Sequence, residues 1–419
     1  MTGAPVSEDA IDAFRREARA WLADRLEPRG DAAARGWGVG PHDVSVFHDL
    51  EPADERARLD AELAWQATKV RAGYGALSWP VEHGGRGLDP RFTAAFAAEE
   101  AAFAAPMGHE LVAVTVRLVA PALLQFGTPA QQAGPMRAFL GGEQLCCQLF
   151  SEPGAGSDLA ALATRARRVD GRWIISGQKI WSSGAHFAQF GLLLARTDPD
   201  VAKHAGITAF LLPLDTPGVD VRPIRQMTGG ASFCEVYLDD VVLEDDAVVG
   251  EVGGGWAVTM AVLGFERESS DGSGDVGGSW EQVHQLAVWA GAYEDPLLRQ
   301  KLARTYTRHH LNQVTRLADA ERRARGESLG ATGSLRKLQW VGLLREVSDT
   351  VTAVLGDRLA ADTGEWGTFS WNDHVLGSLG YSIAGGTDEV QRSIVAERLL
   401  GLPQDPRVDK GLPWSKVPR

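Results

Sequence analysis

A glutamate near the end of an apolar run is a first candidate for chemistry in this sequence. The run "WAVTMAVLGFERESS", residues 256–270, has the length and apolar content of a buried helix, and it contains Glu266. On a helix the neighbours of Glu266 lie three and four positions away, and they carry no positive charge: Val262, Leu263, Ser269 and Ser270. A buried carboxylate without a cation beside it has a raised pKa, which suits a general base. A solvated charge at a fraying helix end is the alternative.

A glycine-rich turn follows a short apolar strand in "CQLFSEPGAGSDLAAL", residues 147–162. Glycines permit positive φ and let a ligand approach the backbone. The small hydroxyls of Ser151 and Ser157 can bond a cofactor ring or an amide. The turn is therefore a candidate ligand site, and an ordinary β-bend with capping residues is the alternative.

A tryptophan stands between a polar turn and two serines in "GQKIWSSGAHFAQFGLLLART", residues 177–197. The indole of Trp181 can cover the face of a flat heterocycle, and the nearby hydroxyl of Ser183 can bond its edge. A core aromatic residue is the alternative interpretation of Trp181.

Composition limits the class of protein that must position these residues. The chain has 419 residues, enough for two or three domains, and its net charge of −13 argues against nucleic acid as a partner. The adjacent Cys146 and Cys147 do not indicate a disulfide framework, which favours a reducing compartment. We see no secretion signal and no run fit for membrane insertion, so we expect a cytoplasmic protein. The adjacent His309 and His310 lack the spacing of metal ligands, so we expect no metal.

The order of the elements along the chain is helical, then β, then helical. One stripe of a first helix carries the apolar residues Ile11, Phe14, Ala18, Trp21 and Leu22. Short β-branched and aromatic runs separated by turns begin near residue 143 and indicate an antiparallel sheet. Long helices are expected over 296–325 and 334–360, and a last one over 387–400. We therefore predict an α+β multidomain protein, with domains at residues 1–142, 143–252 and 253–402 and a tail at 403–419.

The stretches at residues 147–162 and 177–197 together resemble the acyl-CoA dehydrogenases. So do "SWPVEHGGRGLDP", residues 78–90, and "GGTDEVQRSIVAERLLGLP", residues 385–403. The resemblance covers nearly the whole chain in the same order. It implies an N-terminal helical domain, a central β domain and a C-terminal four-helix bundle, with FAD between the β domain and the bundle.

The resemblance also implies roles for individual residues. Trp181 corresponds to an aromatic residue that covers the flavin, and Ser183 to a hydroxyl that approaches flavin N5. Further positions that correspond to contacts with the cofactor are Gln148, Phe150, Ser151, Thr387 and Glu389. Ser157 corresponds to a serine near the CoA moiety, and Arg267 belongs to the same substrate-binding set.

Two departures from the family pattern change the expected chemistry. Many members carry the catalytic glutamate at the position held here by Gly385, whereas a minority carry it directly before an arginine, where Glu266 precedes Arg267. We therefore expect Glu266 to be the base and Gly385 to keep only its backbone N–H as a donor to the thioester oxygen. An arginine motif that reaches the FAD pyrophosphate is absent after this helix. The glycine-rich break that replaces it, at Gly272 and Gly274, could leave room for a bulky acyl group.

The implied reaction is dehydrogenation of an acyl-CoA to the α,β-enoyl thioester, with flavin N5 as hydride acceptor. The implied partners are an acyl-CoA substrate, an electron-transfer flavoprotein and further subunits in a homodimer, homotetramer or hetero-oligomer. Two alternatives stay open. One is an FAD-poor or non-catalytic subunit of a hetero-oligomeric dehydrogenase, and the other is a flavin oxidase or monooxygenase on the same fold.

Overall fold

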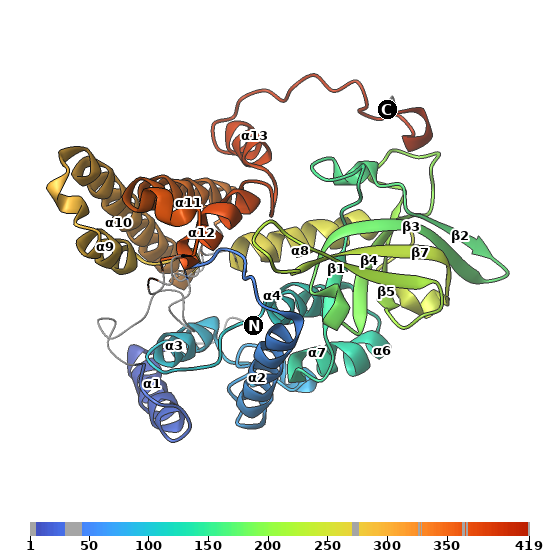
Figure 1. The fold of residues 1–419 in the computed structure, drawn as a ribbon. Coiled ribbons are helices and arrows are strands. Elements are labelled where there is room, and N and C mark those ends of the chain that lie inside the picture. The colour runs from blue at the N-terminus through green and yellow to red at the C-terminus, as the bar shows by residue number, and fades with distance from the viewer. Residues whose placement is uncertain are drawn as a thin grey trace.

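The computed structural model describes residues 6–29, 44–269, 276–325, 327, 329–362, 365 and 368–417. Three parts follow one another along the chain (Figure 1). N-terminal helices lie at the bottom of the view, a β-sheet at the right, and C-terminal helices at the upper left. The predicted order of helical, β and helical parts is confirmed.

The N-terminal part is built from helices, and the first of them shows a single buried face. In α1, Glu8–Ala23, the buried residues are Ile11, Phe14, Ala18 and Leu22, so the predicted stripe is confirmed, with Trp21 half-buried. The further helices are α2 (Pro52–Arg71), η3 (Val81–His83), α3 (Pro90–Glu100), α4 (Glu110–Ala113), η4 (Val114–Val119), α5 (Ala120–Phe126), α6 (Pro129–Gln131), η5 (Gln132–Met136) and α7 (Arg137–Gly141).

Within the described residues, one sheet of eight strands forms the central part, in the order β6-β7-β3-β2-β4-β5-β8, with β1 beside β4. Most neighbours are antiparallel, as predicted, but β1 pairs with β4 in parallel, and β2 meets β4 in parallel through the pair Arg165 and Arg196. The strands are β1 (Cys146–Leu149), β2 (Arg165–Val169), β3 (Arg172–Ser183), β4 (Phe190–Arg196), β5 (Ile207–Pro213), β6 (Val219–Ile224), β7 (Phe233–Leu243) and β8 (Val248–Val249).

Short helical turns connect the strands, and one tight turn has the backbone that its sequence demands. Asp170 and Gly171 link β2 to β3 with φ of 51° and 83°. Positive φ at both central residues matches the right-handed twist of paired strands. The connecting turns are η6 (Leu159–Ala161), η7 (Ala185–Phe187) and η8 (Asp245–Ala247).

The C-terminal part consists of helices packed around α11, Thr332–Leu355. Its core includes Val283, Leu343, Val347 and the fully buried Trp371. The other elements are α8 (Gly255–Ser269), α9 (Trp280–Trp289), η9 (Ala292–Glu294), α10 (Pro296–Ala324), η10 (Gly356–Leu359), α12 (Ser370–Ser378), η11 (Leu379–Ser382) and α13 (Asp388–Arg398). The long helices expected over 296–325 and 334–360, and the last one over 387–400, are therefore present with slightly different ends.

The C-terminal segment returns from α13 to the β domain and docks there (Figure 1). The Trp414 backbone N–H donates to the Val201 carbonyl at 2.9 Å, and its indole N–H donates to Ala161 at 3.2 Å. Lys203 binds both Asp158 and Asp409, at 2.7 and 2.5 Å. The predicted tail is thus attached to the turn that carries Ser157 and Asp158, and it includes the short turn η12, Trp414–Lys416.

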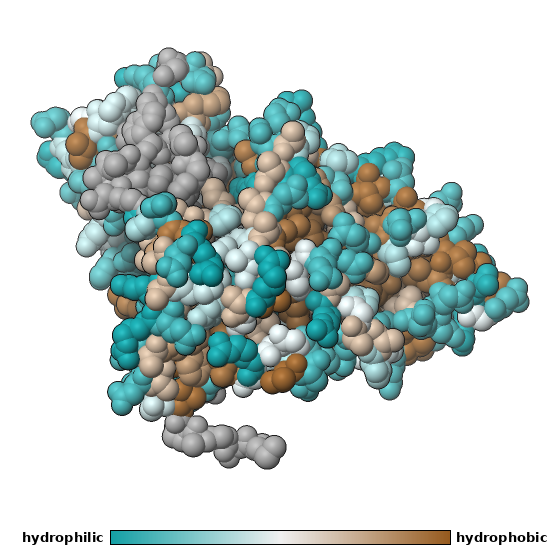
Figure 2. All heavy atoms as spheres, turned by 90° about the horizontal axis from the view of Figure 1, so that it is seen from below, coloured by the Kyte–Doolittle hydropathy of each residue, from teal (hydrophilic) through white to brown (hydrophobic). Residues whose placement is uncertain are grey.

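Hydrophilic and hydrophobic residues are interspersed on the face shown in Figure 2, with several hydrophobic patches over the β domain at the right. None of the helices in the described residues has both the length and the apolar character needed to cross a membrane.

Candidate active site

The helix α8 holds Glu266 at the end of its buried face. Val258 and Val262 are fully buried, and Glu266 lies four residues beyond Val262, on the same face. The helix begins against strand β5, where a Cβ on Gly255 would lie 2.7 Å from the Ala209 nitrogen. Glycine at position 255 therefore permits the close approach of α8 to β5. Eleven residues further along the helix, Glu266 is half-buried. The prediction that residues 256–270 begin a buried helix is confirmed for its described part.

Glu266 points at the turn that precedes α13. A Cβ built on Gly385 would lie 3.0 Å from Oε1 of Glu266. Gly385 has a φ of 64° and Gly386 a φ of 85°, which is the left-handed region that glycine adopts without strain. The sequence therefore predicted a pair, Glu266 and Gly385, that the structure brings together.

Two side chains hold this turn by its carbonyl groups. Nε2 of the buried Gln391 donates to the Gly385 oxygen at 2.7 Å, and Nζ of Lys337 donates to the Gly386 oxygen at 2.8 Å. Within the described residues, the Gly385 N–H donates to no acceptor. The turn is thus fixed by its oxygens, while one N–H stays available to a ligand.

Lys337 also corrects one expectation about Glu266. The residues beside Glu266 on its own helix carry no positive charge, as expected, but Lys337 from α11 is close enough for the two charges to interact. Burial lowers the pKa of Lys337, and the neighbouring Asp388 and Glu266 oppose this change. Glu266 is therefore placed near a cation from another helix, which its local sequence did not reveal.

Tyr381 lies near two carboxylates, those of Glu110 and Glu266. Burial, and after it the charges of Glu110 and Glu266, raise the pKa of the Tyr381 phenol. The ring stacks on Phe47 at 5.1 Å between centroids, and Phe47 in turn meets Phe233 at 5.4 Å. Sequence reasoning identified neither Tyr381 nor Glu110, although Tyr381 stands only four positions before Gly385.

The chain of aromatic rings continues to Trp181. The Trp181 ring meets Phe233 edge-on at 6.0 Å, and Trp181 is 57% exposed with a φ of 61°. Positive φ is uncommon for a bulky residue, and it coincides with an irregularity in the pairing of β3 with β7 between Lys179 and Ser182. The backbone thus holds a large aromatic face toward solvent, an arrangement that costs free energy and that often marks a ligand site.

The hydroxyl groups beside Trp181 have different surroundings. Ser182 is buried, and its Oγ has no hydrogen-bond partner in the described part of the chain. Ser183 donates its hydroxyl proton to Oε1 of Glu110 at 3.1 Å. The Glu110 side chain is exposed, but the protein nearby desolvates its carboxyl group and raises the pKa of that group. The exposed indole of Trp181 and the oriented hydroxyl of Ser183 together fit a planar heterocycle such as a flavin.

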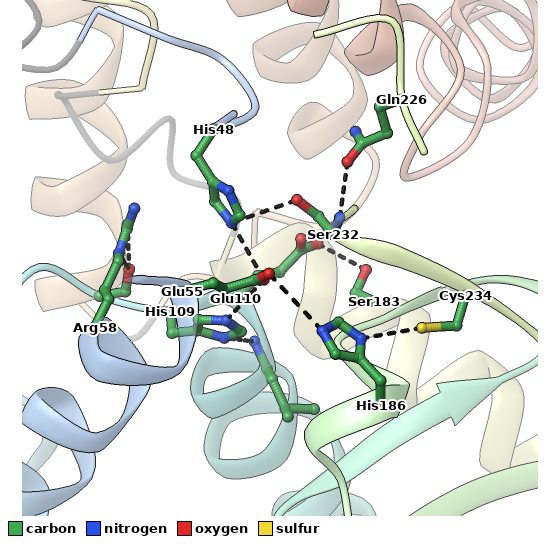
Figure 3. A network of polar contacts seen from close by, with 12 residues as sticks. His48, Glu55, Arg58, His109, Glu110, Ser183, His186, Gln226, Ser232 and Cys234 are labelled. Carbon is green, nitrogen blue, oxygen red and sulfur yellow. Dashed lines mark hydrogen bonds and ion pairs between the residues drawn. The ribbon is translucent and has the colours of Figure 1, made fainter. Parts of the chain in front are cut away.

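A polar network around the buried Glu55 lies near Glu110 and Ser183 (Figure 3). Glu55 of α2 accepts from His48 and His109, each at 3.3 Å, and lies 3.8 Å from His186. Although burial alone would raise the pKa of Glu55, the three histidines hold it well below its usual range. Burial opposes protonation of His186, but its contacts with Cys234 and Glu55 raise its pKa to about 9.

The glycine-rich turn after β1 is fixed by a buried ion pair. Nζ of Lys179, fully buried in β3, lies 2.8 Å from Glu152 and donates to the Phe150 carbonyl at 3.0 Å. Burial favours the neutral form of Glu152, but Lys179 keeps its pKa lowered. Phe150 is 7% exposed. Of the other nearby residues predicted to contact ligands, Gln148 and Ser151 are half-buried, and Ser157 is exposed.

The remaining predicted residues lie at the last helix and at the end of α8. Thr387 is the N-cap of α13 and accepts from the Val390 N–H at 3.2 Å, while Glu389 is exposed and pairs with Arg392. Arg267 lies in α8, and its side chain is outside the described residues. The same holds for Gly272 and Gly274, where room for a bulky acyl group was expected.

Comparisons with known proteins identify the family to which this chain belongs. Family models of the acyl-CoA dehydrogenase N-terminal, middle and C-terminal domains match residues 8–143, 147–241 and 253–400. Acyl-CoA dehydrogenase IpdE1 of Mycolicibacterium smegmatis is 38% identical over 414 residues, covering 94% of this chain and 98% of the relative.

Two solved structures share the fold over nearly the whole chain. The Tcur3481-Tcur3483 steroid ACAD is 28% identical with a TM-score of 0.75, covering 96% of this chain and 100% of the other. The ChsE4-ChsE5 complex from Mycobacterium tuberculosis is 25% identical with a TM-score of 0.67, covering 97% and 100%.

The chain therefore belongs to the acyl-CoA dehydrogenase family. It is an oxidoreductase of the kind that dehydrogenates acyl-CoA thioesters, and both the resemblance and the fold class predicted from the sequence are confirmed. Proteins of this family are flavoproteins, which generally bind FAD.

Proposed function

We propose that this protein catalyses FAD-dependent α,β-dehydrogenation of an acyl-CoA thioester, with Glu266 as the base that takes the α-proton. The observation that carries the proposal is the distance of 3.0 Å between Oε1 of Glu266 and the position of a Cβ on Gly385. A side chain from residue 385 would begin where the Glu266 carboxylate ends. The two positions can therefore present a carboxylate to the same α-carbon.

The turn at Gly385 supplies the second requirement, which is a donor for the thioester oxygen. Negative charge develops on this oxygen as the α-proton leaves, and donors that are already in place stabilise it without reorganisation. The Gly385 N–H suits this role because it has no acceptor within the described residues, and because Gln391 and Lys337 hold the carbonyl groups of the turn. Loss of the carboxylate at residue 385 does not remove this N–H.

The region around Trp181 suits FAD. The indole would cover one face of the isoalloxazine ring, and Ser183 would lie beside N5. FAD, when bound, would accept the β-hydrogen and the two electrons of the substrate. Gln148, Phe150 and Ser151, on and after β1, would meet the ring edge, while Thr387 and Glu389 would lie near the rest of the cofactor.

A ring-bearing thioester is the acyl-CoA that we favour as substrate. The Tcur3481-Tcur3483 protein, which shares the fold over 96% of this chain, is described as a steroid ACAD. Ser157 is exposed at the glycine-rich turn, so it is available to a CoA moiety. Arg267, directly after the proposed base, would bind the same substrate.

We further propose that the protein acts in an oligomer and passes its electrons to an electron-transfer flavoprotein. Leu311, Val314 and Leu317 of α10 are 50%, 48% and 67% exposed, and apolar side chains gathered on one helix are typical of a contact surface. The ChsE4-ChsE5 structure is described as a complex of two chains. A hetero-oligomeric dehydrogenase in which this chain is one subunit is therefore the second candidate.

The purified chain tests the proposal directly. Stoichiometric FAD and anaerobic bleaching of the flavin by an acyl-CoA are the expected results. The thioester panel contains straight, branched and steroid-like acyl groups, and we expect the ring-bearing ones to bleach the flavin fastest. If the chain takes up no FAD alone but gains flavin and activity with a second dehydrogenase chain, the hetero-oligomer replaces the homo-oligomer. If no thioester bleaches bound flavin, the proposed reaction is wrong.

A further inference from the structure

We infer that Glu110 is a positioning residue that orients the hydroxyl of Ser183, so that its oxygen faces the flavin as an acceptor and not as a donor. The inference rests on the proposed function, because it takes Ser183 as the residue beside flavin N5. Glu110 is on the N-terminal helices and Ser183 is on the β-sheet, so the contact joins two parts of the protein (Figure 3).

The position of Glu110 is determined by the residue before it. Glu110 is the first residue of α4, directly after the N-cap His109. The His109 ring accepts from the Leu111 N–H at 3.1 Å and meets Oε1 of Glu55 at 3.3 Å, and its backbone N–H donates to Glu62. His109 is buried, so the start of α4 is anchored on two sides. The Glu110 carboxylate consequently has a defined position from which it reaches Ser183.

The hydrogen bond between them has a chemical consequence. A serine hydroxyl has one proton and two acceptor lone pairs. Because Ser183 gives its proton to Oε1 of Glu110 at 3.1 Å, only lone pairs remain for any other neighbour. N5 of the oxidised flavin is an acceptor, whereas N5 of the reduced flavin carries a hydrogen. The orientation therefore favours the reduced cofactor over the oxidised one.

Glu110 belongs to the same site as the proposed base. Both Glu110 and Glu266 act electrostatically on Tyr381, so both carboxylates lie near this phenol. The Glu110 side chain is exposed, so a ligand can approach it. Its acceptor role thus concerns the reacting edge of the cofactor and not a remote surface.

A double-mutant cycle on the flavin-loaded protein tests this inference. The reduction potential of the flavin is measured without substrate in the parent, Glu110→Ala, Ser183→Ala and the double variant. Glu110→Ala removes a negative charge in both backgrounds, but it frees the Ser183 hydroxyl only where Ser183 is present. Glu110→Ala should change the ratio of affinities for reduced and oxidised FAD about tenfold more in the protein that keeps Ser183 than in the Ser183→Ala background. For a two-electron couple, a tenfold change in this ratio corresponds to about 30 mV.

Two further variants keep the test decisive. Glu110→Asp retains the charge but shortens the side chain by one methylene, so it should also free the Ser183 hydroxyl. It should therefore shift the reduction potential in the same direction as the Ser183-dependent part of the Glu110→Ala effect. Glu8→Ala removes a glutamate from the same first position of α1, after the N-cap Ser7, and it should leave the potential unchanged.

The outcomes separate this inference from the proposed function. Equal effects of Glu110→Ala in both backgrounds, with FAD bound and substrate still dehydrogenated, overturn the orientation of Ser183 alone. If Glu110→Ala does not fold, an unchanged flavin reduction potential in Glu110→Asp likewise overturns the proposed orientation of Ser183. A chain that cannot be loaded with FAD under any condition overturns both.

Discussion

Replacement of Glu266 by glutamine should leave the protein folded and flavin-loaded but unable to take the α-proton efficiently. Glutamine keeps the length of the side chain and its polarity, so the end of the side chain should stay beside Gly385. A general base contributes about 10²–10⁴-fold, which corresponds to about 3–5 kcal/mol of activation free energy. The measurement is the rate of flavin bleaching by an acyl-CoA in an anaerobic stopped-flow instrument.

The structure adds a condition for restoring the activity from the other position. A Cβ at residue 385 would already lie 3.0 Å from the end of the Glu266 side chain, and glutamine fills the same space. Gly385→Glu should therefore restore more activity when residue 266 is alanine than when it is glutamine. The restored rate should stay below that of the parent, because φ at residue 385 is 64° and a non-glycine residue is strained there by about 1–2 kcal/mol.

The control for this series is Glu281→Gln, an exposed glutamate of α9 that lies in the first turn of its helix. It should bleach at the parent rate. If Glu266→Gln is reduced by substrate as fast as the parent, Glu266 is only a helix charge and the base lies elsewhere. Flavin loss in Glu266→Gln would instead show that the side chain supports the cofactor and not the proton transfer.

Three further changes probe the surroundings of the site. Trp181→Ala should alter the flavin absorption spectrum and weaken FAD retention while leaving the circular dichroism unchanged, since the indole is 57% exposed; an unaltered spectrum argues against contact with the ring. Lys337→Met should slow flavin reduction by about tenfold, because the Gly386 carbonyl loses a charged donor at 2.8 Å, and unchanged reduction would show that Gln391 alone fixes the turn. Because folding raises the pKa of His186 from 6.5 to about 9, protonation of His186 stabilises the folded state. This stabilisation is complete below pH about 6.5 and is lost as the pH rises through about 9. Urea midpoints should therefore fall over that interval, and a His186→Gln variant should show a smaller fall.

Local patterns sufficed to predict the elements. The stripe of Ile11, Phe14 and Ala18 is a helical period, and the Asp170-Gly171 turn carries its backbone conformation in its residue types. The two positions at which the family resemblance implies a base, Glu266 and Gly385, also lie in recognisable stretches. Such features depend on residues near one another in the sequence.

The missing parts of the site depend on residues far apart in the sequence. Nothing beside Lys337 in α11 indicates that its ammonium group reaches Gly386 and the charge of Glu266. Glu110 is likewise an ordinary first-turn glutamate until the chain folds and Ser183 arrives from the sheet. The domain packing that brings them together is set by many weak contacts, and no short motif encodes it.

The short distance between residues 266 and 385 also constrains how this site could change over evolutionary time. A full side chain at residue 385 competes for volume with the glutamate at residue 266. If the carboxylate is the base, as proposed for Glu266, a lineage that moves it from one position to the other must pass through a crowded ancestor with both carboxylates or an inactive ancestor with neither. Gene duplication, or a partner chain that supplies activity, would let the inactive ancestor survive. Side-chain sizes at these two positions should consequently vary in opposite directions among descendants of a common ancestor.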